Sequence, residues 1–183
     1  RSGSRGPEET AALAEVTSSP AFRTWFKNSK VVDEQGKPLV VYHGTSDSIH
    51  AFDLNHPNRH DTGWLGDGVY ITTDSDLASS YSMIKRGGGA PNIMPLYVSI
   101  QNPYMATLET KLALRKYTKN EIREWTENLI KKGHDGVILE QGLGKREIVA
   151  FNPSQVKSAF NPGTFDPTRP EVMAGGLSLL GLT

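Results

Sequence analysis

An α+β fold with a mainly antiparallel sheet is predicted for this chain from three features of its sequence. Short apolar runs rich in β-branched residues outnumber the segments with helical periodicity. These runs do not alternate regularly with helices, as the strands of a parallel sheet would. The chain has 183 residues, of which 37% are hydrophobic. This length is enough for one well-buried core but short for two.

Two helices are expected near the N-terminus. The segment PEETAALAEV combines good helix formers with acidic residues in its first turn, where they suit the helix dipole. Phe22, Trp25 and Phe26 follow at helical spacing, so they form one apolar face that is expected to pack a second helix onto the core. The expected divisions are a linker and N-terminal helix at 1–19, one main domain at 20–170 and an irregular tail at 171–183.

Five apolar runs are predicted to be the main strands. Each is short, rich in β-branched or aromatic residues, and bounded by turn-forming residues. A further strand is expected in QVKSAF. We expect the strands to form two packed sheets that split around a cleft. The five runs are residues 39–43, 68–72, 95–100, 136–139 and 147–151.

Two more helices are predicted from their capping residues. Thr73 is expected to cap one helix, and Asp76, three residues later, completes a capping box. Thr118 and Glu121 form the same pattern before a second helix, which Gly133 is expected to end.

The composition excludes several classes of function. Twenty basic residues balance twenty acidic ones, so the whole chain has no net attraction for nucleic acid or anionic membrane. The absence of cysteine excludes disulfides, a thiolate nucleophile and zinc–thiolate sites, and it is consistent with a cytosolic site of action. No apolar run approaches the roughly 18 residues that span a bilayer. The chain is therefore expected to be soluble, with no membrane partner.

A metal site is not expected either. His56 and His60 are four residues apart, which on a helix would place them on one face. However, Pro57 and Asn58 lie between them and argue against a helix. We interpret both histidines as solvated loop residues.

Three features are candidates for chemistry. His43 ends an apolar run and precedes Gly44, whose backbone another molecule can approach closely. Tyr70 and Tyr81 lie eleven residues apart, on either side of one turn, where they either hold a flat molecule or belong to the core. Glu147 opens an apolar strand after a glycine-rich loop, which suits a carboxylate at the mouth of a cleft.

Each candidate has a structural alternative. His43 alone could be a strand-end histidine bonded to a local carbonyl, and the two tyrosines could be ordinary core aromatics. Glu147 could be a solvated charge at a strand edge. Glu140 is a rival acid, but it leads into QGLG rather than into a strand, so Glu147 is preferred.

The order of these features resembles the ADP-ribosyltransferases of the His-Tyr-Glu type. The pattern is HGT, then GxGxYxxxxxxxAxxY, then a Glu that opens a strand. The type includes the diphtheria-toxin-like and poly(ADP-ribose) polymerase-like catalytic domains. The segments IMPLYVSIQNPY, GHDGVI and IVAFNPSQVKSA are similar to such domains in phage polyvalent proteins and in bacterial toxins or effectors. The resemblance covers roughly residues 20 to 170, and it implies split antiparallel sheets around an NAD cleft with flanking helices.

The resemblance also implies roles for individual residues. His43 would bind the adenosine-side ribose of NAD, and the backbone of Gly44 would take the nicotinamide carboxamide. The rings of Tyr70 and Tyr81 would stack on the cationic nicotinamide, which electron-rich ring faces attract. Glu147 would bind the nicotinamide-side ribose and stabilise the positive charge that develops as nicotinamide leaves. The implied catalytic residues are Glu147, His43 and Tyr70, and the implied NAD-binding residues are His43, Gly44, Thr45, Tyr70, Ala78 and Tyr81.

Two positions depart from the family pattern. Polymerase-type members carry a Ser where Ala78 stands, so another donor, such as Ser79 or Thr72, would have to replace its hydroxyl. Lys145 lies two residues before the Glu, where arginine-modifying relatives carry an acid or an amide. This argues against an arginine-specific enzyme.

The function implied by the resemblance is mono-ADP-ribosyl transfer from NAD to a macromolecule. The expected acceptor is a host protein, with nucleic acid as the alternative, and the expected place of action is the cytoplasm of a host or target cell. An NAD glycohydrolase would use the same residues. A catalytically inactive module that binds NAD or ADP-ribose, and a structural domain of a large phage protein, are the remaining alternatives.

Overall fold

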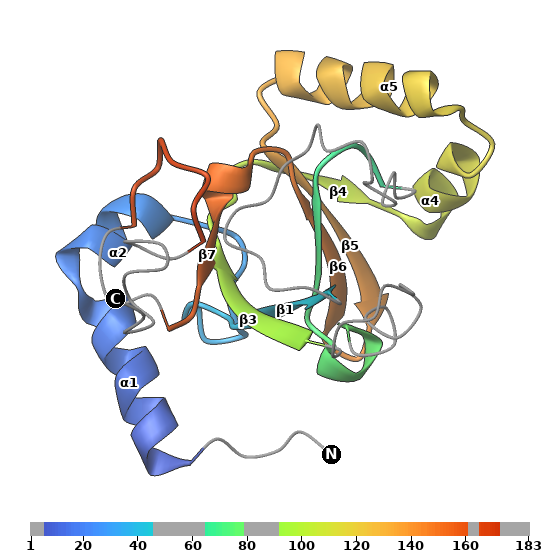
Figure 1. The fold of residues 1–183 in the computed structure, drawn as a ribbon. Helices are drawn as coiled ribbons and strands as arrows, with labels where there is room; N and C mark the ends of the chain where they lie inside the picture. The colour runs from blue at the N-terminus through green and yellow to red at the C-terminus, as the bar shows by residue number, and fades with distance from the viewer. Residues whose placement is uncertain (1–5, 46–64, 79–91, 161–164, 173–183) are drawn as a thin grey trace.

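The computed structural model describes residues 6–45, 65–78, 92–160 and 165–172, which form an α+β fold around one sheet (Figure 1). The predicted fold class is therefore confirmed. The helices are α1 (Pro7–Ser18), α2 (Pro20–Phe26), α4 (Leu108–Leu114), α5 (Lys119–Lys131) and a 3₁₀ turn, η1 (Pro153–Gln155). The strands are β1 (Val41–Thr45), β2 (Val69–Thr72), β3 (Asn92–Val98), β4 (Pro103–Ala106), β5 (Gly136–Gly142), β6 (Lys145–Ala150) and β7 (Val156–Ser158).

The seven strands lie in the order β4-β5-β6-β2-β1-β3-β7. Neighbouring strands run antiparallel, except that β4 is parallel to β5. β1 shares five pairs of Cα partners with β3 but only one with β2, the pair Tyr42 and Thr72. The strands therefore form one continuous sheet rather than the two packed sheets expected from the sequence, and the β1–β2 join has the fewest paired positions.

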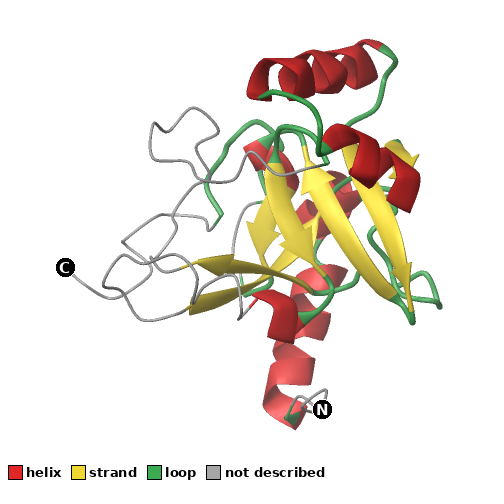
Figure 2. Ribbon diagram, turned by 90° about the vertical axis from the view of Figure 1, so that its right-hand side faces the viewer, coloured by secondary structure: helices red, strands yellow, loops and turns green. Residues whose placement is uncertain are grey.

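Helices cover the sheet at both ends (Figures 1 and 2). α1 and α2 lie beside the β3–β7 end, where Phe22 packs against Phe26 and Tyr97 with ring centroids 5.0 and 5.1 Å apart. The predicted aromatic face of the second helix is thus confirmed. α5 lies over the β4–β5 end, where Leu129 belongs to a buried cluster with Val137. The largest cluster includes residues of β1, β2, β3, β5, β6 and β7.

The capping predictions are confirmed for one helix and wrong for the other. Thr118 and Glu121 exchange side-chain and backbone hydrogen bonds at the start of α5, and Gly133 follows its end with a φ of +90°. The other helix begins one residue later than predicted, at residues 75–78, and its cap is Asp74. The hydroxyl of Thr73 instead accepts a hydrogen bond from the backbone N–H of Arg146.

Two elements, β4 and α4, are not predicted from the sequence. β4 contains only the four residues PYMA and begins with a proline, so it carries no local strand pattern. It is stabilised by its parallel pairing with β5, more than thirty residues away in the chain. α4 follows at once, capped by a reciprocal pair of hydrogen bonds between Thr107 and Thr110.

Candidate active site

The join between β1 and β2 is where two predicted site residues meet. The strands pair Tyr42 with Thr72. Two residues further on, the same register would pair Gly44 with Tyr70. Instead, Nδ1 of His43 lies 2.7 Å from the carbonyl oxygen of Tyr70. Because a carbonyl oxygen only accepts, Nδ1 carries a proton, and a neutral imidazole then presents Nε2 as an acceptor.

The backbone of Gly44 faces the β2 side of its strand. Alternate residues of an antiparallel strand direct their N–H and C=O groups toward the same edge, so Gly44 and Tyr42 share an edge. On the β3 side, Tyr42 lies opposite Pro95, which has no N–H and whose carbonyl accepts from Ala159. The edge shared by Tyr42 and Gly44 is therefore the one toward β2, at the point where the β1–β2 pairing has ended.

The hydroxyl of Tyr70 ties the preceding loop to the strand. It donates to the carbonyl oxygen of Gly66 and accepts from the backbone N–H of Leu65, with 3.0 Å between the donor and acceptor atoms of the latter bond. The side chain is half-buried and packs beside the cluster that contains Val149. Residues 65–70, the first part of the tyrosine motif, are thus held together by hydrogen bonds between the Tyr70 hydroxyl and the loop backbone.

Helix α5 holds the same loop from the other side. The Thr126 hydroxyl accepts from the backbone N–H of Asp67 at 2.9 Å and donates to the carbonyl of Ile122 at 2.8 Å. Gly68 has no room for a side chain, because a Cβ there would lie 2.4 Å from the carbonyl oxygen of Ala150. The close approach of β6 therefore requires the second glycine of the motif.

Glu147 lies on β6 directly opposite Thr72 of β2 and Leu139 of β5. Residues directly opposite each other share one face of a sheet, and the face alternates along each strand. Glu147 therefore lies on the same face as Thr72 and as Tyr70, two residues along β2. The register continues from Thr72 to Tyr42, the residue before His43. Alternation along β1 then places His43 on the opposite face, and the bond from its Nδ1 to the Tyr70 carbonyl joins it to β2. Tyr70 and Glu147 thus share one face of two neighbouring strands, and His43 lies on the next strand of the sheet.

The carboxylate of Glu147 is held by a lysine from α4. Nζ of Lys111 donates to both carboxylate oxygens, at 3.0 and 2.8 Å. Both side chains are largely buried, with exposed fractions of 18% for Lys111 and 15% for Glu147. The rival acid, Glu140, is 66% exposed, and its nearest charged partner is the Arg146 guanidinium at 3.8 Å. Burial and hydrogen bonding therefore both favour Glu147 over Glu140.

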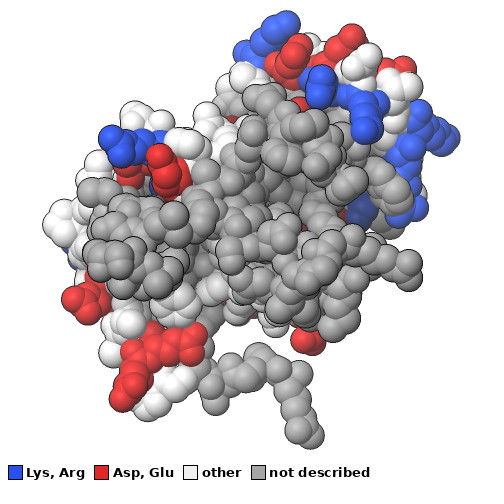
Figure 3. Space-filling view, in the orientation of Figure 1, with Lys and Arg blue, Asp and Glu red and all other residues white. Residues whose placement is uncertain are grey.

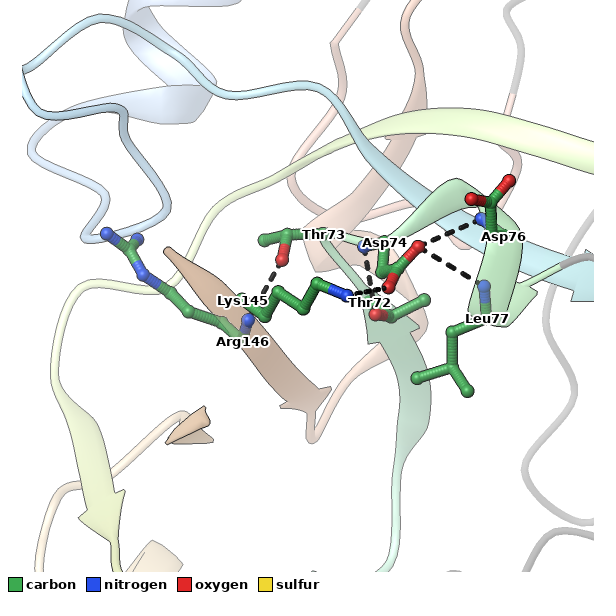
Figure 4. A network of polar contacts seen from close by, with 7 residues as sticks. All are labelled: Thr72, Thr73, Asp74, Asp76, Leu77, Lys145 and Arg146. Atoms are coloured by element: carbon green, nitrogen blue, oxygen red, sulfur yellow. Dashed lines mark hydrogen bonds and ion pairs between the residues drawn. The ribbon is translucent and has the colours of Figure 1, made fainter. Parts of the chain in front are cut away.

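A polar network fixes the turn that leads from β2 toward the second half of the tyrosine motif (Figure 4). Asp74 accepts from the backbone N–H groups of Asp76 and Leu77 and from Nζ of Lys145, the last at 2.8 Å. The Lys145 ammonium and the Leu77 N–H hold the pKa of the Asp74 carboxyl below its usual value, while Asp74 in turn raises the pKa of Lys145. Lys145, which breaks the family pattern, therefore serves as the partner of this cap.

The remaining predicted residues are placed in part. Ala78 is fully buried and is the last described residue of the helix that Asp74 caps, and Thr45 pairs with Asn92 at the end of β1. Thr72 is buried, and its hydroxyl accepts from the backbone N–H of Asp74. Tyr81, Ser79, His56 and His60 lie outside the described residues, so the ring clamp stays a prediction.

Three residues that shape this site, Lys111, Thr126 and Asp74, were not predicted from the sequence. For Asp74 a signal was present, because Asp is as good a cap as Thr and stands one residue closer to the helix. The contacts of Lys111 and Thr126 join positions 36 and 59 residues apart. No local sequence pattern predicts contacts between residues so far apart in the chain.

Neither a metal centre nor a membrane span is found in the part of the chain that the structure describes. There, no three His, Asp or Glu side chains come together as metal ligands would. No described helix combines the length and the apolar character that crossing a bilayer requires.

A comparison with known protein families identifies the family of the chain. The sequence profile of one family, described as ADP-ribosyltransferase in polyvalent proteins, matches residues 33–165. The matched region contains β1, β2 and β6, and with them His43, Tyr70 and Glu147. A search of curated proteins finds no match. Because the matched region makes up well over half of the chain, the protein belongs to the family of ADP-ribosyltransferases found in polyvalent proteins.

Proposed function

We propose that the protein is a mono-ADP-ribosyltransferase that cleaves NAD at the nicotinamide–ribose bond and transfers ADP-ribose to a macromolecular acceptor. The observation that carries the proposal is the sheet register, in which Tyr70 and Glu147 share one face of β2 and β6 and His43 lies on the next strand, β1. The match to an ADP-ribosyltransferase family supports the reaction class.

The local geometry is compatible with NAD as the substrate. With Nδ1 bonded to the Tyr70 carbonyl, a neutral His43 offers Nε2 as an acceptor for a ribose hydroxyl. The N–H and C=O groups of Gly44 face the β1–β2 join, and a carboxamide has the donor and acceptor that match them. Tyr70 is only half-buried, so part of its side chain is accessible to a ligand.

The proposed reaction needs one negative charge close to the reacting carbon. When the C1′–N bond breaks, its electron pair leaves with nicotinamide, which becomes neutral, and the ribose carries the positive charge as an oxocarbenium ion. Glu147 accepts a hydrogen bond from the ribose 2′-hydroxyl, and its negative charge stabilises this cation. The acceptor nucleophile then bonds to C1′ and releases its proton to solvent.

Two measurements on the purified protein test the proposal. The first is nicotinamide release from NAD, compared between the wild type and Glu147→Gln. The second is incubation with labelled NAD and host lysate, followed by mass spectrometry of the labelled species. Label on a macromolecule, lost in Glu147→Gln, supports transfer. Free ADP-ribose as the sole product would instead indicate an NAD glycohydrolase. NAD binding without nicotinamide release would indicate an inactive binding module.

A further inference from the structure

Among the lysines near the site, Lys111 is the one directed at the predicted catalytic carboxylate. Arg115, Lys116 and Lys119 are exposed, and basic side chains gather on the surface where α4 meets α5 (Figure 3). Lys111 differs from them because only 18% of its side chain is exposed. It lies three residues before Leu114, a buried residue of α4, and so on the face of the helix that packs against the protein.

The contact fixes a side chain that the strand alone leaves free to rotate. The Cα of Glu147 is set by pairing with Thr72 on one side and Leu139 on the other. Its carboxylate is three rotatable bonds away. Among the described residues, the hydrogen bonds to this carboxylate come from Lys111 alone. Without the ammonium, a largely buried carboxylate would lose its partner and its fixed orientation.

The geometry leaves room for a substrate hydroxyl. Nζ lies at nearly equal distances, 3.0 and 2.8 Å, from the two carboxylate oxygens, so it sits between them. A carboxylate has about four lone-pair sites. The ammonium occupies the inner site of each oxygen and leaves the outer ones available. One ribose hydroxyl can therefore bond to Glu147 while Lys111 stays in place.

We propose that Lys111 is a positioning residue for the transfer reaction, which orients the Glu147 carboxylate toward the ribose without contacting the reacting atoms. This inference rests on the proposed function. Lys111 orients the Glu147 carboxylate, which stabilises the positive charge on the ribose in the transition state. His43 and Gly44 instead bind NAD in the ground state. Loss of Lys111 therefore lowers kcat rather than raising KM.

The variants to compare are Lys111→Met, Lys111→Arg and, as a matched control near the end of α4, Lys116→Met. Each is tested for nicotinamide release at a temperature well below its melting temperature. We expect Lys111→Met to lower kcat about 10- to 100-fold, because small misplacements of a catalytic group have effects of this size. KM for NAD should change by less than about 3-fold. Lys111→Arg, which keeps the charge and the donors, should restore most of kcat, and Lys116→Met should match the wild type.

A double-mutant cycle shows whether Lys111 acts through Glu147. If it does, adding Lys111→Met to Glu147→Gln causes little further loss. Wild-type or higher kcat in Lys111→Met, or losses that multiply in the double variant, would overturn the inference alone, because the proposed function is tested separately by transfer of label from NAD to a macromolecule. A wild type that binds NAD but releases no nicotinamide would overturn both.

Discussion

Glu147 combines a fixed backbone with a largely buried carboxylate, which is the arrangement that electrostatic catalysis requires. Glu147→Gln keeps the shape of the side chain but removes its charge. We expect nicotinamide release to fall about 10²- to 10³-fold, as it does when comparable stabilising groups are removed. Glu140→Gln is the control, because Glu140 is exposed and should be dispensable. Near-wild-type turnover in a folded Glu147→Gln protein, with a loss in Glu140→Gln, would make Glu140 the catalytic carboxylate instead of Glu147.

A substitution at Tyr70 can test what its hydroxyl contributes to stability while the aromatic ring is kept. Tyr70→Phe keeps the ring and removes the hydrogen bonds to Leu65 and Gly66. Because both backbone groups would lose their partner, we expect the free energy of unfolding to fall by about 1–3 kcal/mol. Urea unfolding measures this, with Tyr104→Phe as a control on the same cluster. An equal effect of the two substitutions would mean that the Tyr70 hydroxyl does not hold the loop.

At the scale of elements, helices and strands with a strong local pattern could be predicted from the sequence. α5 has a capping box and a final glycine, and β2 and β6 are apolar runs. The cap at Asp74 was misplaced by one residue because both Thr73 and Asp74 can cap a helix. In the structure the Thr73 hydroxyl bonds to the backbone N–H of Arg146 on β6, and Asp74 caps the helix. That contact depends on the sheet and cannot be read from the segment itself.

The cap at Asp74 predicts a dependence of stability on acid pH. The lowered pKa of Asp74 means that its charged form stabilises the folded state above the ordinary value of 3.8. This contribution is lost as the pH falls through the lowered pKa. Asp74→Asn keeps an oxygen for the cap but cannot ionise. Urea unfolding at a series of pH values should therefore show the wild type to be more stable near about pH 7, with the difference shrinking below 3.8.

The ion pair between Asp74 and Lys145 allows a second test of this pH dependence. Because the hydrogen bond from Lys145 is the largest cause of the lowered pKa, Lys145→Met should reduce the same difference. A gap between wild type and Asp74→Asn that stays constant from neutral to acid pH would show that the charge of Asp74 does not contribute.

At the scale of the whole molecule, the order of motifs predicted which strands carry the candidate site residues, but not which side chains surround them. His43, Tyr70 and Glu147 could be found because each stands at a strand position with a recognisable neighbour, a glycine or a strand start. Their supporting partners, Lys111 and Thr126, come from α4 and α5, at positions distant in the sequence. Such long-range contacts are set by tertiary packing and leave no periodic trace in the sequence.

The last described segment is held to the sheet by a buried lysine. Lys157 of β7 is 1% exposed, and its Nζ donates to the carbonyl oxygens of Arg169 and Glu171, both at 2.7 Å. The backbone N–H of Ser158 donates to the carbonyl of Val172 at 2.9 Å. Burial lowers the pKa of the Lys157 ammonium, and nearby Glu171 opposes this shift. Burial of the Lys157 charge therefore destabilises the fold, and the two hydrogen bonds from the ammonium offset this cost.

Lys157→Met tests which of these two effects is larger. The methionine keeps most of the apolar stem but donates no hydrogen bond. Bonds from charged donors contribute about 1.5–3 kcal/mol each, and the relief of burial offsets part of their loss. We expect the free energy for local opening of residues 165–172 to fall by about 1–3 kcal/mol, and hydrogen exchange at the Ser158 N–H reports this opening directly.

The Lys30 N–H, which bonds to the carbonyl of Ile100, serves as the reference amide away from this contact. Faster exchange at Ser158 alone supports local docking by Lys157, whereas equal acceleration at both amides would show that the substitution weakens the whole fold. Unchanged exchange at Ser158 would mean that the segment is held by its apolar contacts and not by the lysine.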